Sequence, residues 1–116
     1  MSQQREVIDY LRDILDAVES AEQFTAGMDF DAFVADKKTT FAVIRALEIV
    51  GEATKRIPDA FRQRYPEVPW RQMAGMRDKL SHDYISVNLR RVFDTVRTDL
   101  PLLRSLLVRI LDDLRI

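Results

Sequence analysis

Residues 89–114 read LRRVFDTVRTDLPLLRSLLVRILDDL, and this stretch decides the fold. Its apolar side chains recur every three or four positions, which is the period of one face of an α-helix. They are Leu89, Val92, Phe93, Val96, Leu100, Leu103, Leu107, Ile110, Leu111 and Leu114. Pro101 interrupts the helix without shifting the phase of this stripe, so we expect a kink there and not an end. A helix with one apolar face requires other helices to cover it.

Two upstream segments have the same period. The first carries Val7, Tyr10, Leu11, Ile14, Val18 and Ala21 and should end near Gly27. Asp29 then caps a short turn that carries Phe30 and Phe33. The second runs from about residue 37 to 57, with a stripe of Phe41, Ile44, Leu47, Val50 and Thr54. Gly51 costs that helix about 1 kcal/mol relative to alanine, and a close helix–helix approach is the expected compensation.

The remaining segments are shorter. Pro58 ends or kinks the second helix, and a short helix with Phe61 and Tyr65 stops before Pro66. Pro69 suits the first turn of a helix from about Trp70 to His82, whose apolar stripe is Met73, Met76 and Leu80. Ser86 or Asn88 caps the last helix. The sequence therefore predicts an all-α fold, an up-and-down bundle of four main helices and a short fifth, in a single domain over residues 1–116.

Composition narrows the class of protein. A chain of 116 residues, 47% hydrophobic and 32% charged, is typical of one soluble globular domain. It has no cysteine, which excludes disulfides and thiolate metal sites. Its apolar runs are far shorter than the roughly 20 residues that span a bilayer, and the N-terminus has no signal-peptide pattern. We expect a cytoplasmic protein that has no membrane partner.

Charge is distributed unevenly along the chain. Residues 1–36 hold 2 basic and 9 acidic side chains, whereas residues 55–79 hold 7 basic and 3 acidic ones. The basic stretch leads into the only histidine of the chain. It indicates either an anionic ligand near that histidine or solvated helix faces, and charge alone leaves both open.

The histidine lies in the stretch Arg77-Asp78-Lys79-Leu80-Ser81-His82-Asp83-Tyr84. An arginine binds phosphate, and a neutral imidazole transfers protons near pH 7. On an ideal helix Arg77 and Tyr84 share a face, and Asp78 lies next to His82, where its carboxylate would fix the imidazole tautomer. Arg77 and His82 would be about 140° apart. Either the helix unwinds near His82, or a second subunit completes the site.

Metal-free RNA cleavage needs a base for the 2′-OH and an acid for the leaving 5′-oxygen, on opposite sides of the phosphate. A symmetric dimer supplies two histidines and two arginines. Structural roles remain open: a lone histidine at a helix end is often a cap, Tyr84 can be half-buried core, and Trp70 fits a core anchor. The chain lacks the ligand spacing of a metal site and the glycine-rich loops of nucleotide sites, so we expect no cofactor and no metal.

Several segments resemble one protein family. They are residues 10–15 (YLRDIL), 33–39 (FVADKKT), 42–53 (AVIRALEIVGEA) with Lys55-Arg56, and 65–71 (YPEVPWR) leading into Met76-Arg77-Asp78. With the R-x4-H-x-Y pattern at its usual spacing, the chain resembles the HepT-like proteins of the HEPN superfamily over nearly its whole length.

The resemblance implies a HEPN-type helical homodimer joined through its motif helices. It implies a metal-independent endoribonuclease that is the toxin of a type VII toxin–antitoxin pair. The expected partners are RNA and a cognate MNT-type nucleotidyltransferase antitoxin in a prokaryotic cytoplasm. Arg77 and His82 match the catalytic pair, Asp78 takes the supporting polar position, and Tyr84 matches the tyrosine that the partner silences by AMPylation.

Two other functions remain open. The chain could be a non-catalytic helical HEPN module that binds a nucleotidyltransferase, a nucleotide or both, or a structural helical dimer that has no site. The complete set of Arg77, His82 and Tyr84 favours the enzyme, because a docking module needs none of the three.

Overall fold

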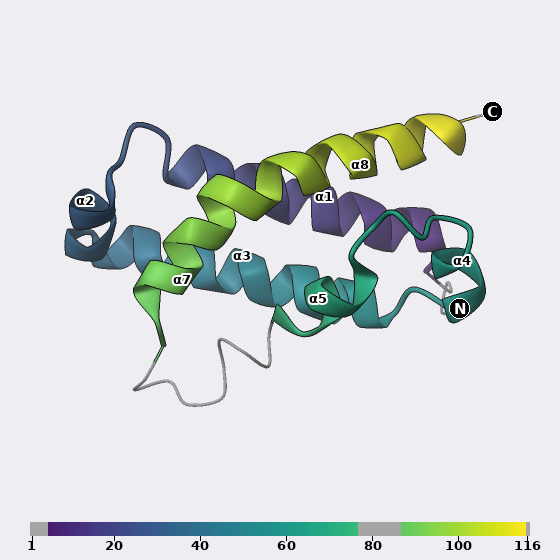
Figure 1. Cartoon of the computed structure of the whole chain (residues 1–116), viewed down its shortest axis with the longest axis horizontal. Helices are drawn as coiled ribbons and strands as arrows, with labels where there is room; N and C mark the ends of the chain where they lie inside the picture. The colour runs from purple at the N-terminus through teal and green to yellow at the C-terminus, as the bar shows by residue number, and fades with distance from the viewer. Residues whose placement is uncertain (1–4, 77–86, 116) are drawn as a thin grey trace.

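Three long helices form the body of the protein: α1 (Val7–Phe24), α3 (Lys37–Lys55) and α8 (Leu100–Asp113). The structure, a computed structural model, describes residues 5–76 and 87–115. Shorter helices complete it: α2 (Phe30–Ala35), α4 (Asp59–Arg62), α5 (Trp70–Ala74) and α7 (Leu89–Asp94). No strand occurs in these two ranges. The predicted all-α bundle is confirmed (Figure 1).

The helices α1 and α3 form the most extensive helix pair and run in opposite directions, side by side (Figure 1). The predicted stripe of α1 is confirmed over its central turns, where Leu11, Ile14, Val18 and Ala21 are buried. The buried positions of α3 include Gly51, as the packing explanation requires. Burial of these two faces against each other supplies much of the hydrophobic stabilisation of the bundle.

The predicted stripe of α3 is wrong at its first position. Phe41 is 64% exposed, and its ring is approached by Lys37 Nζ at 5.6 Å from the ring centroid. The buried face instead includes Thr40 and Val43. Thr40 is tolerated in the core because its hydroxyl donates a hydrogen bond to the Lys37 carbonyl at 2.9 Å. The stripe thus begins one position earlier than Phe41, about 100° away around the helix.

Short polar side chains and one glycine set the helix boundaries between α1 and α3. Asp29 caps α2 by accepting the Ala32 N–H at 2.8 Å, as predicted. Gly27 precedes it with φ +76, a conformation that glycine adopts without strain. Asp36 caps α3 by accepting the Thr39 N–H at 3.1 Å, and this hydrogen bond lowers the pKa of the Asp36 carboxyl.

The helix predicted over residues 70–82 is interrupted early. The helix α5 ends at Ala74, and Gly75 (φ −82, ψ −5) donates its N–H to the Arg71 carbonyl. Glycine weakens a helix because the unfolded chain loses more conformational freedom there than at alanine. The prediction overlooked Gly75 as a helix end. Leu80 and the rest of the predicted helix beyond Met76 lie outside the described residues.

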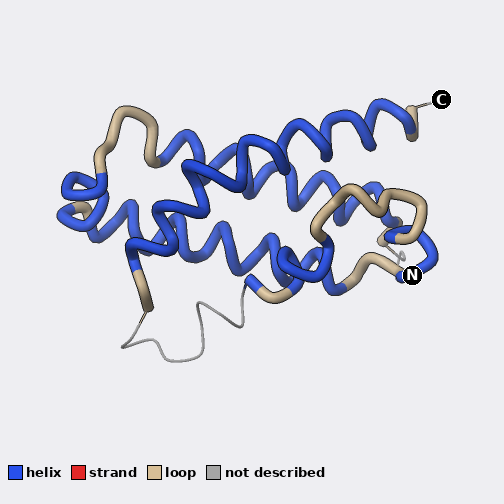
Figure 2. The backbone as a smooth tube through the Cα atoms, in the orientation of Figure 1, coloured by secondary structure: helices blue, strands red, loops and turns tan. Residues whose placement is uncertain are grey.

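The C-terminal stretch is helical from Leu89 to Asp113, as the period predicted (Figure 2). Between α7 and α8 lies η1 (Thr95–Asp99), a wider π-helical turn in which the Leu100 N–H donates to the Thr95 carbonyl five residues back. Pro101 follows directly and has no N–H to donate. The path changes direction here (Figure 1), so the expected kink begins just before Pro101.

An arginine in η1 joins this stretch to the end of α1. The Arg97 guanidinium donates hydrogen bonds to the Thr25 carbonyl at 2.5 Å, the Met28 carbonyl at 2.7 Å and the Thr25 hydroxyl at 3.2 Å. These carbonyls follow the last turn of α1, where they have no partner within the helix.

In the described ranges, no helix is both long and apolar enough to cross a bilayer.

We predict that Arg97→Ala lowers the free energy of unfolding by roughly 2–3 kcal/mol, because it leaves carbonyl groups at the end of α1 without a charged donor. Arg104→Ala is the matched control. Arg104 forms a partly exposed ion pair with Glu22 at 2.8 Å, for which a loss of at most about 1 kcal/mol is expected. Urea denaturation measures both values. Equal losses in the two variants would contradict the capping role of Arg97.

Candidate functional site

The predicted site residues Arg77, Asp78, His82 and Tyr84 lie outside the described residues, so their roles remain predictions. The structure does define the two ends between which this segment runs. Met76 is the last described residue before it, and Val87 is the first after it. Both are partly buried and pack against the hydrophobic core.

The end before the motif is held by Trp70, the first residue of α5. Its side chain is 7% exposed, and its indole N–H donates to the Tyr65 carbonyl at 3.0 Å and to the Arg62 carbonyl at 3.2 Å. Its ring also lies edge-on to that of Phe61, at 6.4 Å between centroids. Met73, one turn later, is 1% exposed. The expectation that Trp70 is a core anchor is confirmed.

The end after the motif is held by a cap and by aromatic contacts. The Asn88 side chain accepts the Arg91 N–H at 3.1 Å, which confirms Asn88 as the cap of α7. Phe93, in the second turn, lies 5.3 Å from the ring of Phe33 and 5.8 Å from that of Phe30. Because Phe30 and Phe33 belong to α2, the start of α7 is fixed against the turn between α1 and α3.

Both ends of the segment rest on the same helix. The helices α5 and α7 each contact α3, and α5 lies toward its C-terminal end in Figure 1. The described residues on either side of the motif are therefore fixed to one rigid support.

Two adjoining depressions lie beside these attachment points. One, of about 440 Å³, is lined by polar side chains that include Asn88, Arg91 and Asp94. The other, of about 250 Å³, is mostly apolar and is lined by Met73, Met76, Leu102, Leu106 and their neighbours. They share Thr98 and Asp99, and together form one groove, which we call the α7–α8 groove.

The polar half of the groove contains charges of both signs. Arg90 is engaged by Asp94 at 3.4 Å and lies over the ring of Phe30 at 4.6 Å. Arg91 is exposed and forms no ion pair with any other described residue. It is the arginine of this half that is available to an external anion.

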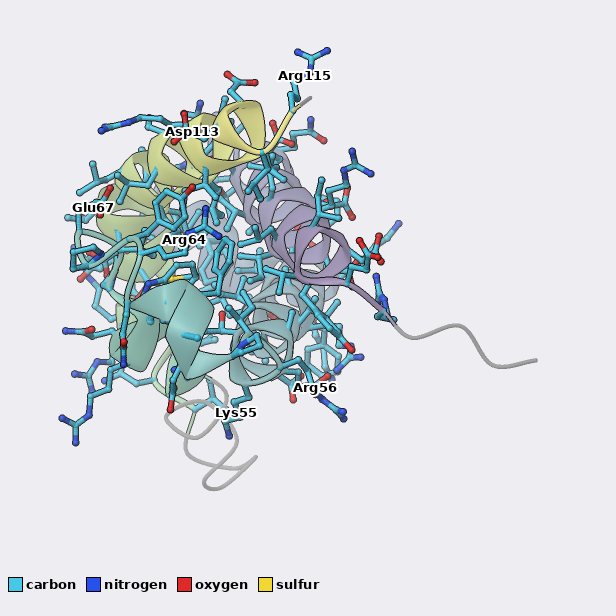
Figure 3. All side chains as sticks on the ribbon, turned by 90° about the vertical axis from the view of Figure 1, so that its right-hand side faces the viewer. Lys55, Arg56, Arg64, Glu67, Asp113 and Arg115 are labelled. Atoms are coloured by element: carbon cyan, nitrogen blue, oxygen red, sulfur yellow. The ribbon has the colours of Figure 1, made fainter. Side chains whose placement is uncertain are left out.

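The basic stretch of residues 55–79 is dispersed over the fold. Arg62 caps the end of α3 by donating to the carbonyls of Thr54 and Ile57, at 2.8 and 3.0 Å. Arg64 lies over the rings of Phe61 and Tyr65. Figure 3 shows Lys55, Arg56 and Arg64 at one end of the bundle, spread over different elements. These four side chains thus come from different elements of the fold; Arg77 and Lys79 lie outside the described ranges.

Sequence patterns missed two features near the motif. Gly75, which ends α5, was read as part of a continuous helix. Leu102 and Leu106 were left out of the α8 stripe, although the adjacent pairs Leu102-Leu103 and Leu106-Leu107 indicate a second apolar face.

Among residues 5–76 and 87–115, no group of three His, Asp or Glu side chains is arranged to hold a metal ion.

The described frame and the motif it carries match a known family. The family described as "Ribonuclease HepT-like" matches residues 14–110, from Ile14 in α1 to Ile110 in α8. The chain belongs to the HepT-like ribonuclease family. The family resemblance drawn from the motif and its flanks is thereby confirmed.

Individual HepT-like relatives extend over similar lengths. The "Probable ribonuclease HepT" of Thermococcus cleftensis is 55% identical over 97 residues, which cover 84% of this chain and 88% of the relative. A "Putative RNase" of Methanocaldococcus jannaschii is 39% identical over 110 residues, 95% of each chain. Another, from Caldanaerobacter subterraneus, is 42% identical over 102 residues, 88% of this chain and 91% of the relative. No solved structure matches the chain.

Gly75→Ala tests whether the stability of the fold depends on the glycine that ends α5. An added Cβ would lie 3.4 Å from the Arg71 carbonyl oxygen and 3.7 Å from that of Gln72, which are ordinary contact distances. Alanine also favours helix by about 1 kcal/mol over glycine. We predict that the variant unfolds at the same or a higher urea concentration. A clear loss of stability would show that the backbone at Gly75 is more constrained than its dihedral angles indicate.

Proposed function

We propose that this protein is a metal-independent endoribonuclease, the toxin of a type VII toxin–antitoxin pair. The observation that carries the proposal is the R-x4-H-x-Y motif, set between two anchored helix ends in a chain of the HepT-like ribonuclease family. Relatives with ribonuclease names cover most of the chain. They come from prokaryotes, and we propose that the protein is cytoplasmic and that residues 1–116 form a single domain.

The proposed chemistry needs no metal. One His82 removes the proton from a ribose 2′-OH, whose oxygen attacks the adjacent phosphorus. The bond to the 5′-oxygen breaks, and a second histidine protonates that oxygen as it leaves. Arg77 neutralises the charge on the pentacoordinate phosphate, and Asp78 fixes the imidazole tautomer. The products are a 2′,3′-cyclic phosphate and a free 5′-hydroxyl.

A homodimer supplies the second histidine, because each chain contains one. A two-fold axis near the motif would place an acid and a base on opposite sides of the phosphate, which one imidazole cannot achieve alone. Two arginines would then share the phosphate charge.

The proposed antitoxin is an MNT-type nucleotidyltransferase that transfers AMP from ATP to Tyr84. The phenol oxygen attacks the α-phosphorus, forms an O–P bond and releases pyrophosphate. The added phosphate brings negative charge two residues from His82, where RNA phosphate must bind. Arg77 would pair with it and become unavailable to substrate.

We predict that the wild-type protein cleaves RNA in EDTA, and that His82→Ala and Arg77→Ala each lower the rate at least a hundredfold, on the order expected for lost acid–base or charge stabilisation. The measurement is single-turnover cleavage of a labelled RNA, with end-group analysis for the cyclic phosphate. A requirement for magnesium or full activity in His82→Ala would contradict the mechanism. Nucleotidyltransferase binding without any cleavage by the wild type would favour the non-catalytic docking module.

We predict that Tyr84→Phe retains ribonuclease activity and escapes modification, because it loses the acceptor oxygen and keeps the ring. Intact mass after incubation with the cognate nucleotidyltransferase and ATP measures the modification. Wild-type protein should gain AMP-sized increments of mass. Increments that persist in Tyr84→Phe would place the modified residue elsewhere.

A further inference from the structure

The α7–α8 groove is bordered by both described ends of the motif segment. Asn88, close after the segment, lines the polar half of the groove, and Met76, which directly precedes Arg77 in the chain, lines the apolar half. Thr98 and Asp99 belong to both halves. A ligand that binds in the polar half therefore lies beside the described residues on which the motif begins and ends.

Two charged side chains of the polar half have no partner within the described chain. Arg91 and Asp99 are both exposed, and neither forms an ion pair with another described residue. Asp99 directly precedes α8, but its side chain accepts no capping hydrogen bond. The other two charges neutralise each other, because Arg90 is engaged by Asp94 at 3.4 Å and also lies over the ring of Phe30. The depression thus offers one free guanidinium and one free carboxylate.

The spacing of these two groups leaves room for a ligand between them. Arg91 belongs to α7, and Asp99 is the last residue of η1, eight positions later, or roughly 12 Å along a helix axis. The wider turn of η1, in which Leu100 bonds back to Thr95, forms the wall between them, and such turns are frequent at functional sites. The depression of about 440 Å³ has the size of a small-ligand site.

A nucleotide of RNA presents groups complementary to both side chains. Its phosphate is an anion that a guanidinium binds in a bidentate manner, and its 2′-hydroxyl is a donor that a carboxylate can accept. An inorganic anion or a DNA strand would be repelled by the carboxylate and would offer it no hydroxyl in return. Opposite charges in one depression therefore favour a ribonucleotide over either of these ligands.

We infer that Arg91 and Asp99 form a subsite for a nucleotide that flanks the cleaved bond. Arg91 binds the phosphate of that nucleotide, and Asp99 accepts a hydrogen bond from its 2′-hydroxyl. The subsite rests on the proposed function in one respect, namely that the ligand is RNA. The attacking 2′-hydroxyl already requires ribose at the cleaved position. The subsite extends the discrimination between RNA and DNA to a neighbouring nucleotide, which takes no part in the chemistry.

Arg91→Ala tests the phosphate contact. The dissociation constant of a labelled single-stranded RNA should rise roughly tenfold, and the slope of its logarithm against the logarithm of salt concentration should fall by about 0.7, as one phosphate contact is lost. Fluorescence anisotropy measures both, on protein that also carries His82→Ala so that the RNA stays intact. Arg12→Ala is the matched control, because Arg12 is exposed on α1, which lines neither half of the groove. It should change neither value.

Asp99→Ala tests the hydroxyl contact, by comparing the RNA with DNA of the same sequence. The preference for RNA should fall roughly fivefold, because RNA loses a hydrogen bond and DNA loses only a repulsive charge. Asp99→Asn should keep part of the preference, since its amide oxygen still accepts a hydrogen bond. Asp112→Ala removes the same charge from an exposed position of α8 outside the groove, and it should leave the preference unchanged.

These readouts separate the subsite from the catalytic proposal. RNA binding that depends on Arg91 and Asp99, in a protein that cleaves no RNA, would support the subsite and refute the proposed ribonuclease. Cleavage of RNA with unchanged affinity and RNA preference in the folded variants would overturn the subsite alone. Circular dichroism checks folding, and sedimentation velocity checks assembly. Variants that alter assembly and leave RNA affinity unchanged would make the depression a contact between subunits and would overturn the subsite.

Discussion

Close packing around α3 is the constraint on which the rest of the structure depends. The helices α1, α2, α5 and α7 all contact it, and its buried face runs its whole length from Thr40 to Thr54. Polar side chains on that face form their hydrogen bonds within the helix: the Thr54 hydroxyl donates to the Val50 carbonyl at 2.6 Å. The helix α3 therefore provides a fixed support for the helices packed on it, because a close-packed core leaves its side chains little room to shift.

This support explains how a short chain fixes the helices on either side of the motif. The helices on either side of the motif are anchored by buried groups, Trp70 and Met73 before it, Val92 and Phe93 after it. The two described ends of the segment are therefore fixed by core packing.

The C-terminal helix has two apolar faces. One face closes the core, and Arg97 ties its π-helical turn to the end of α1. The other presents Leu102 and Leu106 to the α7–α8 groove. The wider turn at η1 lies beside Pro101, which would otherwise clash with a carbonyl one turn back. The chain thus changes direction at Pro101, and this change separates α7, which packs on α2, from α8, which packs on α1.

The sequence by itself determined the helices, the caps at Asp29 and Asn88, the burial of Trp70 and the membership of a family, because helical period, capping chemistry and motif spacing are local properties of a chain. It misplaced Phe41 and overlooked Gly75, since a periodic stripe can be drawn through neighbouring positions and a glycine inside a helix pattern is often tolerated. Only the tertiary structure decided which of the two apolar faces of α8 is covered, and that Arg62 and Arg97 serve as helix caps rather than as anion ligands. Those outcomes depend on which surfaces meet, and contacts between residues as distant as Thr25 and Arg97 leave no local pattern in the sequence.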